Sequence, residues 1–161
     1  HSVRTIFDIF RGINEIIWGL IFVSMVGLGP FPGVLALAAH VTGALGRYFS
    51  EAIETVDQET IKAIVSTGAN KIQVIIRGII PQVKPLFLNY TLYYLENNFR
   101  AATVLGLVGA GGIGMELLTS MRLFRNQEVL TILIIMVSMV TIIDRLSAYI
   151  RKKVLKVDHL E

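Results

Sequence analysis

The sequence predicts an all-α integral membrane protein, a polytopic helical bundle, from its composition, its uncharged runs and its basic clusters. Apolar residues make up 53% of the 161-residue chain and charged residues only 17%, whereas an average soluble domain carries roughly 25% charged residues. No Asp, Glu, Lys or Arg occurs from Ile16 to Gly46. Long uncharged runs followed by basic clusters are typical of membrane spans. A very apolar soluble helical bundle is the alternative.

Four spans are expected in this bundle. Two of them, at about 6–28 and 33–52, are separated by the turn from Gly29 to Gly33, whose prolines cannot continue a helix. A third apolar stretch runs from Leu86 to Val108, and a fourth runs from Val129 to Ile143. At about 1.5 Å per residue, a helix of about 20 residues crosses the roughly 30 Å of hydrocarbon.

Basic residues orient the predicted spans, because cytoplasmic loops carry an excess of Lys and Arg. The turn from Gly29 to Gly33 has none. The basic residues lie in the 47–84 connection (Arg47, Lys62, Lys71, Arg77 and Lys84) and in the tail (Arg145, Arg151, Lys152, Lys153 and Lys156). Both chain ends and loop 47–84 are therefore expected in the cytoplasm. We expect one transmembrane domain over 1–157, with 50–84 as a cytoplasmic loop and 158–161 as a tail or expression remnant.

Several kinds of chemistry are excluded by what the sequence lacks. With no cysteine, the chain has no disulfide, thiol nucleophile or Cys-ligated zinc. Its histidines, His1, His40 and His159, are far apart, and no His, Asp or Glu cluster has metal-ligand spacing. No GxxxxGK[ST] motif occurs, so the chain cannot bind ATP through a P-loop of its own. We therefore expect no catalytic residue, cofactor, metal, nucleic-acid partner or enzymatic activity.

The first half of loop 50–84 has the pattern of a short amphipathic helix. Asp57 can cap a helix that begins near Gln58, because an aspartate side chain accepts hydrogen bonds from the free N–H groups of the first turn. Three apolar residues share one face at i, i+3 and i+4 spacing: Ile61, Ile64 and Val65. Gly68 is expected to end this helix, since glycine readily takes the left-handed conformation of a C-cap.

The second half of the loop, from Ala69 to Ile80, predicts another amphipathic helix. Its apolar stripe consists of Ile72, Ile75, Ile76 and Ile79, and the helix is expected to stop at Pro81. Both short helices would lie at the inner membrane face. A helix that merely rests on lipid is the alternative to a helix with a protein partner.

A glycine-rich run from Gly109 to Gly114 matches GxGxxG after an apolar stretch. A dinucleotide site would need a βαβ unit and an acidic residue about 20 residues further on. Glu128 and Asp144 lie at other spacings, and the following segment is an apolar span. The glycines instead predict a helix break at the outer face and a short helix from Ile113 to Leu123. Such irregular backbone is tolerated at membrane depth where it is buried in protein or lines an aqueous path.

Polar residues fall near the middle of the third span: Glu96, Asn97, Asn98 and Arg100. A lone charge at that depth costs about 2.5–3.5 kcal/mol on insertion scales, so these residues should face protein or water. They are candidates for lining a translocation pathway, where the Arg100 guanidinium would suit an oxyanion. The alternative is that Glu96 and Arg100, at i and i+4, neutralise each other. His40, in the second span, is expected to be a packed polar residue rather than a ligand.

Part of the cytoplasmic loop resembles a known motif. The run from Lys62 to Gly68 (KAIVSTG), nine further residues and the run from Gly78 to Pro81 (GIIP) are similar to the EAA loop of ABC importer permeases. That pattern reads E-A-A, three residues, G, nine residues, I-x-L-P. Matches stand at Ala63, Gly68 and Pro81. Departures are Lys62 in place of Glu, Ile64 in place of the second Ala, Gly78 in place of Ile, and Ile80 in place of Leu.

Two longer stretches resemble the permease subunit of phosphonate-type binding-protein-dependent ABC importers: GLGPFPGVLALAAHVTGALGRYFSEAIETVD and LENNFRAATVLGLVGAGGIGMEL. The similarity runs over about residues 10–155. It implies the bundle of a type I ABC importer permease (MetI-like) in the bacterial cytoplasmic (inner) membrane. The membrane core of that family usually has at least one more helix before residue 1. The chain is therefore expected to be the carboxy-terminal part of a permease, or an unusually short one.

The resemblance also implies roles for particular residues. The 58–80 loop would be the coupling helix that docks on a separate ATPase, through Glu59, Lys62, Ala63, Gly68, Ala69 and Pro81. Glu59 would supply the charge that the family places at the position of Lys62. A gate would lie beside the helix break at Gly109, Gly111, Gly112 and Gly114.

The implied partners are a cytoplasmic ABC ATPase dimer, an extracytoplasmic substrate-binding protein and a second permease copy, in contact with membrane lipid. Small residues of the second span would allow close contact between helices: Gly33, Ala36, Ala38, Ala39, Gly43, Ala44 and Gly46. The expected function is import of phosphonate, or of a related phosphorus oxyanion, by alternating access. The alternatives are an amino-acid or methionine importer permease and a passive channel or membrane scaffold.

Overall fold

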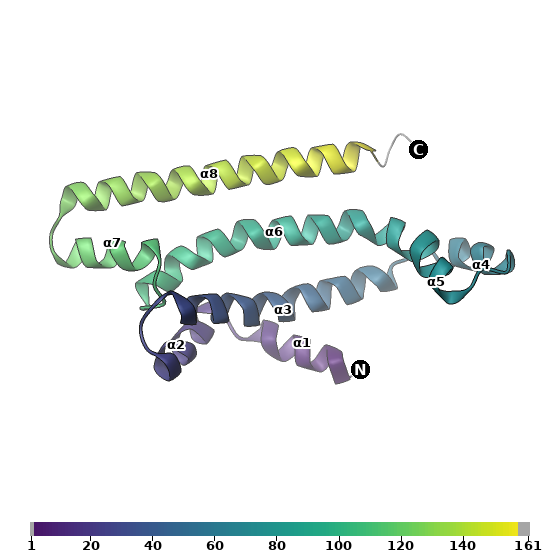
Figure 1. Cartoon of the computed structure of the whole chain (residues 1–161), viewed down its shortest axis with the longest axis horizontal. Helices are drawn as coiled ribbons and strands as arrows, with labels where there is room; N and C mark the ends of the chain where they lie inside the picture. The colour runs from purple at the N-terminus through teal and green to yellow at the C-terminus, as the bar shows by residue number, and fades with distance from the viewer. Residues whose placement is uncertain (1, 158–161) are drawn as a thin grey trace.

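The computed structural model describes residues 2–157, and that part of the chain is helical with no strand. Its body is a row of three long helices, α3 (Pro30–Glu54), α6 (Ile80–Leu107) and α8 (Asn126–Val157), with α6 in the middle (Figure 1). The predicted all-α bundle is confirmed. The absence of strands from residues 2–157 also excludes a βαβ dinucleotide site there.

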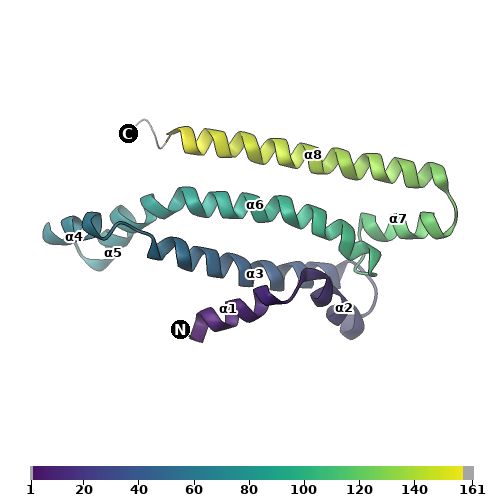
Figure 2. The same cartoon turned by 180° about the vertical axis from the view of Figure 1, so that it is seen from behind.

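Shorter elements gather at the two ends of this row. At one end α7 (Ile113–Arg122) packs against α6 and α8. At the other end, α4 (Gln58–Ser66), α5 (Lys71–Val74) and a π-helical turn, η1 (Ile75–Ile79), extend beyond the row (Figures 1 and 2). The residues between α6 and α7, 108–112, are called the glycine loop below. The tail at 158–161 lies outside the described residues.

The single helix expected at about 6–28 is wrong. The segment forms α1 (Ser2–Gly12) and α2 (Glu15–Val26), bent by 87° at the break. Asn14 caps α2, because its side-chain oxygen accepts the Ile16 N–H at 2.9 Å. Gly12 favours the end of α1 and Glu15 suits the first turn of α2, so the bend has a local cause.

Helix α1 lies against α3, and small residues of α3 make the approach possible. A side chain at Gly43 or Gly46 would collide with Phe7 or Phe10 of α1. Ion pairs also connect these two helices: Arg4 pairs with Glu54, and Arg47 Nη1 lies 3.5 Å from Asp8 Oδ2. The small residues that the sequence offered for contact between copies are thus partly used inside the chain; Ala36 and Ala44, for example, are fully buried.

One helix among the described residues, Asn126–Lys153 within α8, is long and apolar enough to cross a membrane by itself. The bent α1–α2 pair would be a second span if both helices belong to one broken span. Helices α3 and α6, of 25 and 28 residues, have the length to cross the roughly 30 Å of hydrocarbon. Their charged residues, such as Arg47 and Glu96, pair with neighbouring side chains.

The helix expected to stop at Pro81 does not stop there. The chain continues from α5 through η1 into α6, with Pro81 in the first turn of α6 and Pro85 inside it. A proline is tolerated in a first turn because its missing N–H needs no partner there. Within η1 the turn is wider than an α-helix, since the Ile80 N–H donates to the Ile75 carbonyl five residues back.

Candidate functional site

Helix α4 begins at the cap that the sequence predicts. The Asp57 carboxylate accepts the Thr60 hydroxyl at 2.6 Å, the Glu59 N–H at 3.0 Å and the Thr60 N–H at 3.3 Å. These hydrogen bonds, that of the Thr60 hydroxyl first, hold the pKa of the Asp57 carboxyl below its usual value of 3.8. The helix ends at Ser66, and Gly68 follows in the left-handed region at φ +81°. Both predicted boundaries are confirmed.

One face of α4 points away from the rest of the chain. It is formed at i, i+3, i+4 and i+7 spacing by Glu59, Lys62, Ala63 and Ser66, all of them exposed. We call these four residues the outward face of α4. Opposite them, Ile61 and Ile64 are half-buried against Gly78 of η1. The outward face has one charge of each sign and a small residue, Ala63, that would let another surface approach closely.

The other residues predicted for ATPase coupling lie around this helix. Gly68 and Pro81 are exposed, and Ala69 is half-buried in the turn before α5. The stripe predicted for the second loop segment is mostly open: Ile72, Ile75 and Ile76 are exposed, while Ile79 is half-buried. No residue of α4 or α5 is buried. This end of the molecule therefore offers a thin, accessible protrusion.

The charged residues in the middle of α6 pair with α8 and not with each other. Arg100 Nη2 donates to Asp144 Oδ1 at 3.1 Å, and Arg151 Nη2 donates to Glu96 Oε1 at 3.0 Å. The alternative that Glu96 and Arg100 neutralise each other is thus wrong. Each of them is neutralised by an opposite charge on α8, which packs against the face of α6 that carries them. Asn97 and Asn98 are half-buried beside them.

The glycine loop breaks the helix as predicted, and α7 begins at Ile113. Its backbone packs directly on the turn before α3: the Gly29 N–H donates to the Gly109 carbonyl at 3.1 Å. At Gly111, which has φ +77°, a side chain would meet the backbone of Gly29 and Pro30. Gly114 similarly lies against the Thr103 carbonyl of α6.

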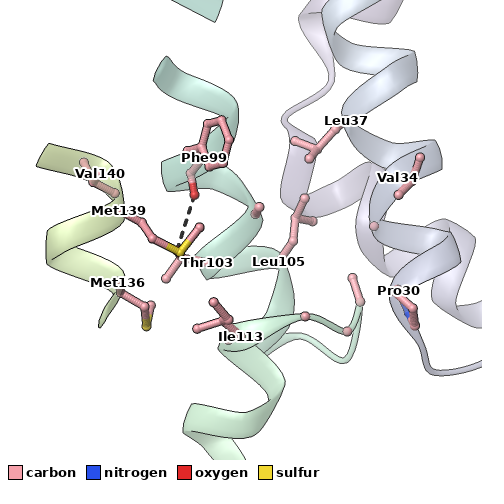
Figure 3. A pocket seen from close by; sticks show the side chains of 16 residues that line it. Pro30, Val34, Leu37, Phe99, Thr103, Leu105, Ile113, Met136, Met139 and Val140 are labelled. Atoms are coloured by element: carbon pink, nitrogen blue, oxygen red, sulfur yellow. Dashed lines mark hydrogen bonds between the residues drawn. The ribbon is translucent and has the colours of Figure 1, made fainter. Parts of the chain in front are cut away.

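A cavity of about 280 Å³ lies beside this loop, between α3, α6 and α8 (Figure 3). Its lining is mostly apolar and includes Val34, Leu37, Phe99, Met136 and Met139. The Thr103 hydroxyl donates a hydrogen bond to the Phe99 carbonyl oxygen at 3.3 Å. The predicted glycines Gly111, Gly112 and Gly114 line this cavity, whereas Glu96, Asn97, Asn98 and Arg100 do not. An apolar lining does not suit an oxyanion.

A second cleft, which the sequence did not suggest, opens between α7 and α8. It has a volume of about 570 Å³ and is lined by Glu116, Ser120, Gln127, Glu128 and Thr131, with three isoleucines. Glu128 accepts the Ser120 hydroxyl at 3.1 Å and Arg125 Nη1 at 3.2 Å. The sequence signal that could have indicated this cleft is the i, i+4 spacing of Glu116 and Ser120, which places both polar residues on one face of α7. Within the described residues, no group of His, Asp and Glu could hold a metal ion.

His40 has the packed position expected of it. It is half-buried on α3, with Nδ1 3.1 Å from the Ile13 carbonyl oxygen and Nε2 3.9 Å from Glu15 Oε2. These contacts place it against the bend between α1 and α2.

The chain is similar to known transport permeases. It is 46% identical over 149 residues to the phosphite transport system permease protein PtxC of Stutzerimonas stutzeri, over 92% of this chain and 54% of that protein. It is 43% identical over 119 residues to the putative cryptic phosphonate transport system permease protein PhnE2 of Escherichia coli (strain K12), over 74% of this chain and 98% of that one. The chain spans about half the length of the phosphite permeases that it matches.

A more distant relative and a solved structure extend the similarity. The phosphate-import permease protein PhnE of Mycolicibacterium smegmatis is 34% identical over 149 residues, over 92% of this chain and 28% of that one. The inward-facing MetNI methionine ABC transporter matches with a TM-score of 0.74 and 22% identity, over 95% of this chain and 74% of that one. At this identity the match shows the fold, which is that of a type I importer permease.

Fold and sequence similarity together define a multi-pass permease of the inner membrane. The model of the family described as "Binding-protein-dependent transport system inner membrane component" matches residues 1–156, and the chain belongs to that family. The resemblance to phosphonate-type importer permeases is confirmed by the phosphite and phosphonate relatives. These relatives are transport permeases by name, in agreement with the expectation of a transport subunit.

Proposed function

We propose that this chain is a membrane-spanning subunit of an ATP-driven importer for phosphonate or a related phosphorus oxyanion. The relatives named for phosphite, phosphonate and phosphate support this substrate class. ATP is hydrolysed by a separate ABC ATPase dimer, a substrate-binding protein delivers the oxyanion, and a second permease copy completes the pathway. The alternating-access cycle then moves the oxyanion inward.

The observation that supports this proposal best is the protruding α4 with its outward face. The four outward residues lie on one side of a helix that extends beyond the row of long helices. A short, exposed helix of this kind fits a groove on a partner, with Ala63 at the closest approach and Glu59 and Lys62 pairing with charges beside it. Gly68, Ala69 and Pro81 set the direction in which α4 leaves the row.

The arrangement of the ends supports the proposed orientation. The start of α1, the end of α8 and α4 all lie at the same end of the bundle (Figure 2). We infer that this is the cytoplasmic end of one transmembrane domain over 1–157, which includes the 47–84 loop. The glycine loop, with Gly109, Gly111 and Gly112, then lies at the outer end beside the gate, and Gly114 lies in the first turn of α7 there.

The role of the charged residues of α6 follows less directly from the geometry. Because Arg100 pairs with Asp144 and Glu96 pairs with Arg151, a structural role is favoured over contact with the oxyanion. The pathway function of Glu96, Asn97, Asn98 and Arg100 stays a prediction, and the transport assay proposed in the Discussion tests it at Arg100.

Capture of an ABC ATPase in mild detergent tests the proposal. The tagged permease is mixed with the ATPase subunit of a phosphite or phosphonate importer, and recovery is compared between wild type and Ala63→Trp. We expect wild type to retain the ATPase and Ala63→Trp to lose it, because the indole fills the surface of closest approach. Val65→Trp is the matched control, since Val65 is 53% exposed on the same helix but lies outside the outward face.

Failure of folded wild type to retain the ATPase would contradict the proposal and favour a passive channel or scaffold. The methionine importer alternative is separated by transport. Vesicles containing the assembled importer should take up a phosphorus oxyanion and not methionine in the presence of ATP.

A further inference from the structure

We propose that Gly78 positions α4, because the Ile64 side chain packs into the space that a side chain at residue 78 would occupy. We call Gly78 the seat of α4. Gly78 lies in η1 and is buried, although it is part of a segment whose neighbours Ile75, Ile76 and Arg77 are exposed. A Cβ placed on Gly78 would stand 3.1 Å from Ile64 Cδ1 and 3.8 Å from Ile61 Cγ1. The half-buried side of α4 therefore packs against Gly78 and can do so only because this residue has no side chain. This positioning role rests on the proposed function of α4.

The backbone of the same residue is held by a polar contact. Gln82 Nε2 donates to the Gly78 carbonyl at 3.0 Å, and Gln82 Oε1 accepts the Asp57 N–H at 3.0 Å. One side chain thus joins the first residue before α4 to the carbonyl of its seat. Apolar contacts from Ile61 and Ile64 and the polar bridge from Gln82 fix α4 relative to η1, although no residue of α4 is buried.

The two residues in contact are also two of the departures from the EAA pattern. Ile64 stands where that pattern has a small residue, and Gly78 stands where it has a large one. A large-for-small exchange on α4 and a small-for-large exchange on η1 leave the packed volume nearly constant, which is the kind of paired change that a close contact tolerates. We infer that the two positions form one unit and that neither can change alone.

The location of this contact gives it a mechanical role. Residue Gly78 belongs to the π-helical turn through which the chain enters α6, and α6 lies at the centre of the bundle. Force applied to the outward face of α4 therefore reaches α6 through Ile64, Gly78 and the turn between them. In this chain the seat determines the angle at which α4 is presented to its partner.

A double-mutant cycle on the full chain in detergent tests the seat. Gly78→Ile alone should raise the amide exchange rates of α4 by about tenfold or more, because overpacking costs enough to displace a weakly held helix. Ile64→Ala combined with Gly78→Ile should restore exchange to within about threefold of wild type, since contacting residues are not additive. Val65→Ala combined with Gly78→Ile is the matched control and should not restore it.

The overturning result is a Gly78→Ile/Ile64→Ala double variant whose α4 exchanges as fast as in Gly78→Ile, or faster. If Gly78→Ile does not fold, Gly78→Val replaces it in the same cycle, and the same comparison decides. ATPase capture by the same variants separates this inference from the proposed function. Rescue of both exchange and capture supports the seat as the device that presents α4. Rescue of exchange in a protein whose wild type captures no ATPase retains the seat and rejects the coupling function.

Discussion

Glycine is used in two different ways at the two ends of this permease. At the end that carries the glycine loop, Gly111 of the loop and Gly114 of α7 let backbone lie directly on backbone, against Pro30 and Thr103. At η1, Gly78 leaves a space that is filled by the tip of a side chain, Ile64. Backbone cannot yield to an added methyl group, whereas a side chain can change its rotamer. The glycine-loop end is therefore held by contacts between backbones, whereas α4 is held by side chains, which open more readily.

The sharpest test of this comparison lies within the glycine loop itself. Gly111 and Gly112 both have positive φ, of +77° and +71°, but only Gly111 has neighbours where a side chain would stand. We expect Gly111→Ala to destabilise the chain by about 3 kcal/mol or more, from strain of about 1–2 kcal/mol plus overpacking of about 1–3 kcal/mol. Gly112→Ala should cost only the backbone strain, of about 1–3 kcal/mol, because φ +71° and ψ −166° lie in a region that is used almost only by glycine.

Thermal unfolding of both variants in the same detergent measures this difference. Equal losses of stability would show that backbone conformation, and not contact with Pro30, is what the glycine loop requires. That result would remove the distinction between the two ends.

Amide exchange compares the two ends directly in the unmodified protein. Helix α4 has no buried residue, whereas Ala101, Leu105 and Gly106 of α6 are buried next to the glycine loop. Local opening of α4 should therefore need much less free energy, and its amides should exchange at least about a hundredfold faster than those at 101–106. Similar protection at both ends would contradict the expectation that α4 opens more readily than the glycine-loop end.

The cap of α4 provides a smaller and pH-dependent change at the α4 end. Asp57→Ala removes the acceptor of the Glu59 and Thr60 N–H groups and should increase exchange within α4 only. Asp57→Asn keeps an acceptor oxygen and is the matched control. Circular dichroism should show less loss of helix for Asn than for Ala.

The sign of the pH effect follows from the lowered pKa of Asp57. Its contribution to the helix is complete above the usual carboxyl pKa of 3.8 and is lost as the pH falls through the lower pKa of the folded protein. Wild type should therefore lose protection of α4 in acid, and Asp57→Asn should not. A glycine loop with the same acid response would contradict the assignment to Asp57.

A further effect is expected between the two ends, at the Arg100–Asp144 pair. Arg100→Gln leaves the Asp144 carboxylate without its partner inside a proposed membrane span, and a lone charge there costs about 2.5–3.5 kcal/mol on insertion scales. Exchanging the two residues, with Arg100→Asp and Asp144→Arg, should restore that loss. Oxyanion uptake by the assembled importer should stay near the wild-type level with Arg100→Gln; loss of uptake from a stable protein would instead place Arg100 on the pathway.

The sequence predicted the features that depend on local signals. The cap at Asp57, the stop before Gly68 and the start of α7 at Ile113 follow from single residues with strong backbone preferences. The bend between α1 and α2 had such a signal too, in Gly12 and Asn14, but the uncharged run from Ile16 favoured one long helix.

Features that depend on contact between distant helices could not be predicted in the same way. Glu96 and Arg100 are four residues apart and attract each other in an isolated helix, yet each finds a partner on α8. The continuation through Pro81 depends on η1, whose wide turn is stabilised by packing against α4. The predicted coupling residues of α4 are exposed together because the opposite face of that helix, with Ile61 and Ile64, packs against Gly78. No local sequence pattern specifies this contact.

Helix α8 has a consequence for how this sequence can change over evolutionary time. Only 6% of its apolar window is buried inside the chain, and between 142 and 153 its buried or paired positions are Asp144, Ser147 and Arg151. These positions lie at i, i+3 and i+7, on one narrow stripe that faces α6. Mutations should therefore accumulate freely among apolar residues on the remaining surface, while the stripe changes rarely and in pairs with α6. Related sequences should show a helical period of variable and constant positions along the second half of α8, imposed by its contact with α6.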